Sequence, residues 1–161
     1  MKSYVESLDA CAPSIPAPGC ETPPFSYAFQ PIVDVVAREI YSFEALIRGP
    51  GNEPAYQVLR CVPPQLKYQF DRDSRVAAIA LGARLGLDRN LNLNFLPQGL
   101  DNSTDAIKST IEAAVENHIR LDRLIVEITE GEMIHDPGRF VALVNEYRAM
   151  GIQVAIDDFG A

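Results

Sequence analysis

Residues 152–161 read IQVAIDDFGA, and this stretch indicates the fold of the whole chain. An almost uninterrupted apolar run leads into two adjacent carboxylates, Asp157 and Asp158, and then into a Phe-Gly turn. The pattern is typical of a buried parallel strand, and parallel strands carry functional side chains at their carboxyl ends. Adjacent carboxylates repel each other unless a cation or a raised pKa offsets the repulsion. The structural alternative is an Asx turn that caps the strand.

The composition is typical of one soluble globular domain and argues against a nucleic-acid-binding protein. Of the 161 residues, 47% are hydrophobic and 22% are charged, and the formal net charge is −8. A chain this acidic offers no positive field to a nucleic acid polymer. A small anionic ligand would need metal ions or one well-placed arginine.

Cysteine usage and hydropathy favour a cytoplasmic protein. Cys11, Cys20 and Cys61 form no Cys-x-x-Cys pair, and an odd number cannot close a disulfide set. A reducing cytoplasm is the simplest setting for them. No apolar run approaches about 18 residues, so we expect neither a signal segment nor a membrane span.

The N-terminal part predicts a flexible segment followed by a β-hairpin. Residues 1–24 hold five prolines and few large apolar side chains, so we expect a flexible lead-in there. Residues 25–36 (FSYAFQPIVDVV) and 39–48 (EIYSFEALIR) are β-rich runs separated by two residues. Pro31 favours an edge position for the first of these strands.

Helices and strands then alternate, which predicts an α/β fold. A helix is expected over residues 69–85, and its predicted buried face carries Val76, Ile79, Ala80 and Ala83. We expect further strands at residues 91–97, 124–130 and 152–158, and further helices at about 104–118 and 137–150.

Polar side chains interrupt these strands at Glu44, Asn94, Glu127 and Asp157. Asn94 and Glu127 are 33 residues apart, and Glu127 and Asp157 are 30 apart, which fits one strand-helix unit each. If successive strands are neighbours, these oxygen atoms converge at one end of a parallel sheet. Carboxylate and amide oxygens suit Mg²⁺, Mn²⁺ or Ca²⁺. With Asp158 next to Asp157, a second cation could bind for an in-line displacement at phosphate.

Glu44 and Arg48 lie on the same face of their predicted strand because side chains alternate along a strand. Four residues of strand separate them by about 13 Å along its axis. That separation is too long for a direct ion pair.

Five short segments, taken in order, resemble the signature segments of the EAL family of bacterial cyclic-di-GMP phosphodiesterases. They are FQPI (29–32), EALIR (44–48), NLNFLP (92–97), EITE (127–130) and DDFGA (157–161). The NFLP and DDFGA forms are most similar to the subgroup found behind blue-light-sensing BLUF domains. The resemblance implies a TIM-like (β/α) barrel with an antiparallel first strand, of which residues 25–161 would hold about the first five strands.

The resemblance also implies a site and a reaction. Two divalent cations, Mg²⁺ or Mn²⁺, would serve hydrolysis of cyclic-di-GMP to linear pGpG. The first cation would be held by Glu44, Asn94, Glu127 and Asp157, and the second by Asp157 and Asp158. Gln30, Leu46 and Arg48 would contact the dinucleotide, with Arg48 on a phosphate, and Glu44, Asp157 and Asp158 would be the catalytic carboxylates.

The resemblance ends in the loop after the fifth strand, and two expectations follow, beside two alternative readings. Hydrolysis is expected to be impaired, because the remaining barrel units normally supply a lysine near the attacking water, and no lysine follows Lys108. The alternatives are a catalytically inactive EAL-like module that binds cyclic-di-GMP or a protein partner, and an unrelated metal-dependent barrel enzyme. An unpaired apolar strand at residues 154–158 predicts that the chain forms a homodimer through this edge or is a fragment of a longer protein.

Overall fold

A computed structural model of the chain describes residues 22–95, 103–129 and 137–157. The described strands are β1 (Ser26–Asp34), β2 (Glu39–Arg48), β3 (Asn90–Asn94), β4 (Leu124–Thr129) and β5 (Gln153–Asp157). The described helices are α1 (Ala55–Leu59), α2 (Lys67–Arg84), α3 (Ser103–Glu116) and α4 (Pro137–Ala149), with short 3-10 turns at Pro64–Leu66 and Leu121–Arg123. None of these helices is long and apolar enough to cross a bilayer. Most of the predicted lead-in, residues 1–21, lies outside the described residues.

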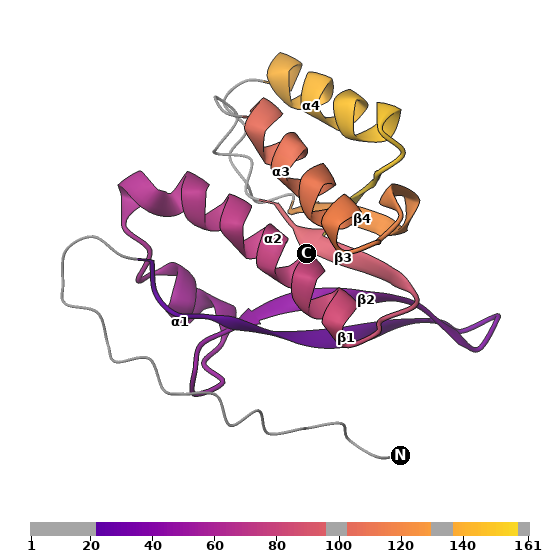
Figure 1. Ribbon diagram of the computed structural model, residues 1–161, viewed down its shortest axis with the longest axis horizontal. Coiled ribbons are helices and arrows are strands. Elements are labelled where there is room, and N and C mark those ends of the chain that lie inside the picture. The colour runs from indigo at the N-terminus through magenta and orange to yellow at the C-terminus, as the bar shows by residue number, and fades with distance from the viewer. Residues whose placement is uncertain (1–21, 96–102, 130–136, 158–161) are drawn as a thin grey trace.

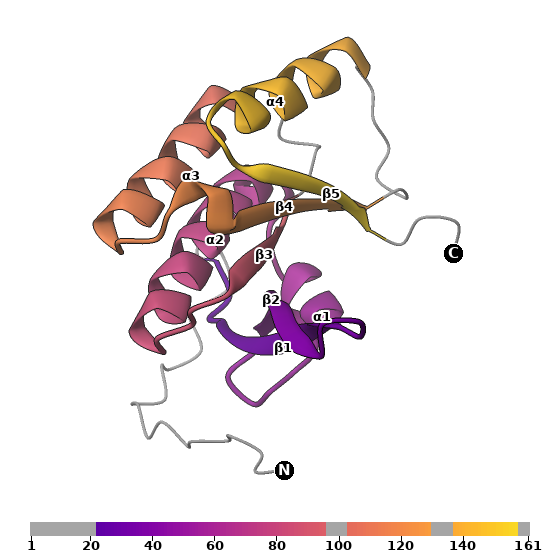
Figure 2. The same cartoon turned by 90° about the vertical axis from the view of Figure 1, so that its right-hand side faces the viewer.

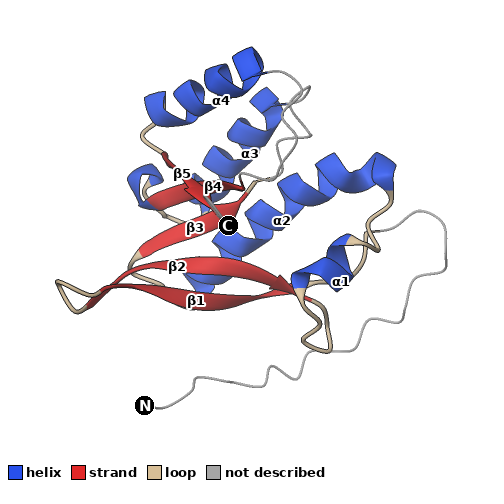
Figure 3. Cartoon of the chain, turned by 180° about the vertical axis from the view of Figure 1, so that it is seen from behind, coloured by secondary structure: helices blue, strands red, loops and turns tan. Residues whose placement is uncertain are grey.

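The five strands form one mixed sheet in the order β1-β2-β3-β4-β5 (Figure 3). β1 and β2 pair antiparallel as a hairpin, and β2 to β5 pair parallel through helical crossovers. The predicted α/β fold with an antiparallel first strand is therefore confirmed. Pro31 lies on β1, which is an edge strand of this sheet, as predicted.

The hydrophobic core lies between the sheet and helices α2, α3 and α4, which cover one of its faces (Figures 1 and 2). Leu91 and Leu93 of β3 and Val126 of β4 point into this core and are at most 2% exposed. Because side chains alternate along a strand, their neighbours Asn92 and Glu127 lie on the opposite face. The helix-covered face is therefore apolar, and the opposite face is polar towards the carboxyl ends of the strands.

The buried side of helix α2 agrees only in part with the predicted one. Of the predicted positions, Ile79 is fully buried, Val76 and Ala83 are half-buried and pack against the core, and Ala80 is half-buried. The buried side of the helix is made by Phe70, Asp71, Ser74, Arg75, Ala78, Ile79 and Gly82. This side includes three polar residues, at positions 71, 74 and 75, which make contacts inside the protein.

The sheet opens at the carboxyl ends of β2 and β3. Their pairing runs over three residue pairs and reaches Glu44 and Asn92, although β2 continues to Arg48 and β3 to Asn94. In contrast, β3 stays paired with β4 up to Asn94 and Glu127. The diverging ends of β2 and β3 leave room for a cavity at the edge of the sheet where the polar side chains lie.

Candidate metal centre

Three carboxylates from three different strands meet at this edge. Glu44 of β2, Glu127 of β4 and Asp157 of β5 each offer one oxygen, and these oxygens all lie within 4.8 Å of one another. The parallel register produces this arrangement, because it brings the carboxyl ends of β2, β4 and β5 to the same side of the sheet. The structure thus brings together three of the residues proposed from the sequence.

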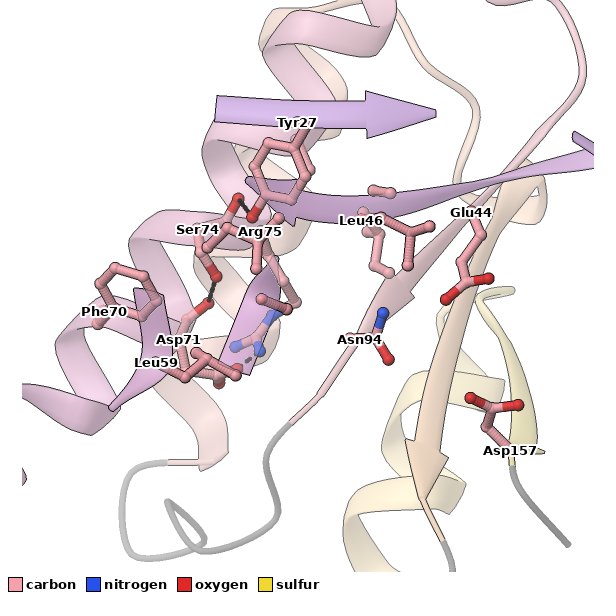
Figure 4. A pocket seen from close by; sticks show the side chains of 15 residues that line it. Tyr27, Glu44, Leu46, Leu59, Phe70, Asp71, Ser74, Arg75, Asn94 and Asp157 are labelled. Atoms are coloured by element: carbon pink, nitrogen blue, oxygen red, sulfur yellow. Dashed lines mark hydrogen bonds and ion pairs between the residues drawn. The ribbon is translucent and has the colours of Figure 1, made fainter. Parts of the chain in front are cut away.

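Asn94 lies beside these carboxylates. It ends β3, between β2 and β4, and it lines the same cavity as Glu44 and Asp157. Figure 4 shows the polar ends of these three side chains turned towards a common space. Asn94 is exposed to solvent, so its amide oxygen is accessible to a cation. Asp158 lies outside the described residues.

The cavity measures about 370 Å³ and extends from Glu44, Asn94 and Asp157 to the helices. Leu46 lies between its two ends, and Asp71 and Arg75 of α2 line the far end (Figure 4). Most of the wall between the polar ends is apolar. A ligand held at the carboxylate end would therefore find apolar surface next to it.

Burial determines the electrostatics of Glu127. Its side chain lies in a strand interior and is 7% exposed, and this burial raises the pKa of its carboxyl above the usual range. A hydrogen bond from Asn92 acts in the opposite direction, and the carboxylates of Glu44 and Asp157 raise the pKa further. A proton or a cation near this carboxylate would relieve the repulsion.

Asn92 orients Glu127, a role that the sequence did not reveal. Its Nδ2 donates to Oε1 of Glu127 at 2.5 Å, and both side chains are buried. Within the described part of the chain, Oδ1 of Asn92 and Oε2 of Glu127 have no hydrogen-bond partner. The sequence feature that could have indicated this role is the position of Asn92, two residues before Asn94 on the same polar face.

The residues present fit a hard divalent cation. Three carboxylates and one amide supply only oxygen ligands, which Mg²⁺, Mn²⁺ and Ca²⁺ prefer. The buried Oε2 of Glu127 has no hydrogen-bond partner among the described residues and could serve as a ligand atom, because Asn92 holds the other oxygen in place. A cation would also offset the repulsion among the three carboxylates.

The residues predicted to contact a dinucleotide differ in whether they line the cavity. Gln30 of β1 pairs with Glu44 across the hairpin and is exposed, and Leu46 lines the cavity. Arg48 is half-buried at the end of β2, and its Nη1 donates to the carbonyl oxygen of Ile47 at 2.8 Å. Arg48 is not among the residues that line the cavity.

Comparison with solved structures identifies the class of fold. The chain superimposes on a standalone EAL protein of Vibrio cholerae O395, in its c-di-GMP-bound form, with a TM-score of 0.78 and 42% identity. The match covers 85% of this chain and 58% of that chain. BlrP1 of Klebsiella pneumoniae, in a complex with manganese and c-di-GMP, matches with a TM-score of 0.79 and 33% identity over 90% of this chain and 36% of that chain. The five-stranded sheet is therefore part of a TIM-like barrel.

The family follows from the sequence comparisons. The family model of the EAL domain matches residues 18–161, so this chain belongs to the EAL family. It is 32% identical over 157 residues to the blue light- and temperature-regulated antirepressor BluF of Escherichia coli K12. That match covers 97% of this chain but 38% of BluF, so the chain spans less than half the length of this curated relative. The predicted resemblance to the BLUF-associated EAL subgroup is confirmed.

Proposed function

We propose that this chain carries the cation-binding part of a cyclic-di-GMP phosphodiesterase, which hydrolyses cyclic-di-GMP to linear pGpG with Mg²⁺ or Mn²⁺. The convergence of Glu44, Glu127 and Asp157 from three strands is the observation that carries this proposal. A relative named probable cyclic di-GMP phosphodiesterase PdeI, 27% identical over 153 residues, supports the reaction. The manganese complex of BlrP1 supports the type of cofactor.

The side chains of the site would serve either as cation ligands or as contacts to the dinucleotide. Glu44, Asn94, Glu127 and Asp157 would hold the first cation, and Asp157 with Asp158 would hold a second. A divalent cation at this place supplies Lewis-acid stabilisation of charge on phosphoryl oxygens. Gln30, Leu46 and Arg48 would position the dinucleotide, with Arg48 on a phosphate.

When the 161-residue chain is assayed by itself, we expect it to bind cyclic-di-GMP but to hydrolyse it slowly. The described residues place three carboxylates around one cation position, whereas a second position depends on Asp158. Since in-line displacement at phosphate gains from charge stabilisation on both sides of phosphorus, a second position held by Asp157 and Asp158 alone would slow the reaction more than it weakens binding.

Turnover tests the proposal through Glu44. With cyclic-di-GMP and Mn²⁺, we expect the wild-type chain to form pGpG slowly and Glu44→Ala to lower the rate by about 100-fold, because it removes a cation ligand. Formation of pGpG is followed by chromatography. Glu116→Ala, an exposed carboxylate at the end of α3, is the matched control and should keep the wild-type rate. An equal rate in Glu44→Ala would contradict the assignment.

A second candidate function is a non-enzymatic module that binds cyclic-di-GMP or a protein partner. BluF, the relative with 32% identity over most of this chain, is named an antirepressor. In this case calorimetry would show saturable binding of cyclic-di-GMP or of a partner protein, while no pGpG forms with either Mg²⁺ or Mn²⁺. Glu44→Ala would then leave binding of a protein partner unchanged.

We also propose that the isolated chain self-associates through β5. Among the described strands β5 is the outermost one beyond β4, and its Ile156 is 64% exposed. Unpaired strand edges with apolar side chains promote association, and a lysine on the edge opposes it. We therefore expect light scattering to give a mass above 17.7 kDa for the wild type and a mass near 17.7 kDa for Ile156→Lys.

The control for this measurement is Val141→Lys on α4, where the original side chain is 56% exposed. It removes a comparable apolar surface away from the strand edge and should leave the mass unchanged. A wild-type chain that is monomeric at all concentrations would overturn the proposed association.

A further inference from the structure

Helix α2 turns a polar stripe towards the protein interior. Asp71 lies one turn before Ser74 and Arg75, and each of the three is at most 9% exposed. Oγ of Ser74 donates to the carbonyl oxygen of Asp71 at 2.8 Å, and the hydroxyl of Tyr27 on β1 donates to the carbonyl oxygen of Ser74 at 2.8 Å. The stripe is therefore tied to the sheet at its β1 side.

Arg75 connects this stripe to the carboxyl end of β3. Its Nη1 donates to Oδ2 of Asp71 in a buried ion pair, and its guanidinium carbon lies 4.8 Å from the centre of the Phe95 ring. The Phe95 ring also meets Tyr147 of α4 edge-on, with 6.2 Å between ring centres. The backbone N–H of Phe95 donates to the carbonyl oxygen of Glu127 at 2.9 Å. Phe95 is thus held by α2, by β4 and by α4.

Stability alone does not account for a charged pair in this place. Replacing a buried ion pair with apolar groups of similar size is often neutral or stabilising, since the charges lose their hydration. Within the described residues, Nε and Nη2 of Arg75 have no hydrogen-bond partner, so the pair is also incompletely satisfied. The location of the Asp71–Arg75 pair indicates another role. Asp71 and Arg75 line the cavity that ends at Glu44, Asn94 and Asp157 (Figure 4).

We propose that the Asp71–Arg75 pair is a positioning device for the candidate metal centre. The pair holds the Phe95 ring, and Phe95 directly follows Asn94 at the end of β3. This inference rests on the proposed cation site and adds positioning residues that do not touch the cation.

The coupling acts through the backbone of β3. Consecutive side chains of a strand point to opposite faces, so the direction of the Phe95 ring fixes the direction of the Asn94 amide on the other face. The hydrogen bond from Phe95 to the backbone of Glu127 also fixes the distance between two cation ligands on neighbouring strands. Since cation affinity depends on ligand placement to within a few tenths of an ångström, a looser Phe95 weakens binding without removing any ligand.

The test is a double variant, Asp71→Asn with Arg75→Met, which removes both charges together and leaves no buried charge unpaired. We expect the free energy of unfolding to stay equal or rise, while the affinity for Mn²⁺, measured by calorimetry on the full chain, falls about tenfold. Arg75→Lys keeps a cation over the Phe95 ring and should retain part of the affinity. The matched control is Ile79→Val, one turn further along the same buried face, which should leave the affinity unchanged.

A double-mutant cycle with Asn94→Ala shows whether the effect passes through Asn94. In the Asn94→Ala background the double variant should cause little further loss of affinity, since the ligand that it positions is already absent. If the double variant does not fold, Phe95→Leu replaces it, because this change removes the ring face and keeps an apolar side chain.

The outcomes separate this inference from the proposed function. Equal affinity for Mn²⁺ in the wild type and the double variant, with a clear loss in Asn94→Ala, would overturn the positioning role and leave the cation site intact. A loss of affinity that simply adds to that of Asn94→Ala would also overturn it. A wild-type chain that binds no Mn²⁺ would overturn the proposed cation site and this inference together.

Discussion

Replacing Glu127 with glutamine is expected to stabilise the chain without cations and to abolish its stabilisation by Mn²⁺. The carboxylate is buried and lies close to Glu44 and Asp157, so its charge opposes folding. Glutamine removes the charge, and its amide can donate to the unpartnered Oδ1 of Asn92. We expect a gain of about 1 kcal/mol, the usual net contribution of one hydrogen bond.

The stability gained by Glu127→Gln should depend on pH. The pKa of Glu127 is raised by burial in the folded chain, so the folded state holds its proton to a higher pH than the unfolded state. The resulting stability is fully present below the ordinary pKa of a glutamate and is lost as the pH rises through the raised pKa. The advantage of Glu127→Gln over the wild type should therefore grow from acidic to neutral pH.

Cations are expected to reverse the order of stability. At a Mn²⁺ concentration about 100 times the dissociation constant, binding stabilises the wild type by about 2.7 kcal/mol, or roughly 5–10 °C in Tm for a chain of this size. Glu127→Gln should show little of this increase. The measurement is thermal unfolding with EDTA or with Mn²⁺, and the control is Glu146→Gln on the exposed side of α4. Parallel shifts in both variants would rule out a role for Glu127.

Removal of Asn92 is expected to have the second-largest effect. Asn92→Ala leaves Oε1 of Glu127 buried without its hydrogen bond, which costs about 1–3 kcal/mol when the carboxylate is charged. Loss of this bond also raises the pKa of Glu127 further, since the bond from Asn92 lowers it. The destabilisation should therefore be larger at pH 7.5 than at acidic pH, where Glu127 is protonated.

Urea unfolding at both pH values, with calorimetry of Mn²⁺ binding, measures this effect. We expect the Mn²⁺ affinity of Asn92→Ala to fall 10–100-fold, as is usual when the hydrogen-bond partner of a metal ligand is lost. Asn145→Ala, an exposed amide on α4, should change stability by less than about 0.5 kcal/mol. Wild-type Mn²⁺ affinity in Asn92→Ala would show that Glu127 needs no orienting partner.

The sequence was sufficient to predict the sheet and the convergence of the carboxylates. Alternation in β3 and β4 separated the core side chains Leu93 and Val126 from the polar side chains on the other face. Glu44, Glu127 and Asp157 could be brought together from the sequence because parallel neighbours place their carboxyl ends on one edge. These predictions depend only on strand periodicity and on the order of the strands.

The contacts around the site could not be predicted from periodicity. The polar stripe of α2 breaks the expected amphipathic pattern, because Arg75 is buried and contacts Asp71 and Phe95. The bond from Asn92 to Glu127 joins residues that are 35 positions apart and depends on the register of β3 and β4. Side chains that are polar and buried are thus identified by their tertiary partners and not by their spacing.

Calorimetric titration of Mn²⁺ into the metal-free 161-residue chain, beside Glu127→Gln, tests the central claim most directly. The claim is that the three carboxylates of β2, β4 and β5 form a divalent cation site. We expect saturable binding to the wild type and an affinity about 100-fold lower in Glu127→Gln. No binding to the wild type, or equal binding to both chains, would contradict the claim.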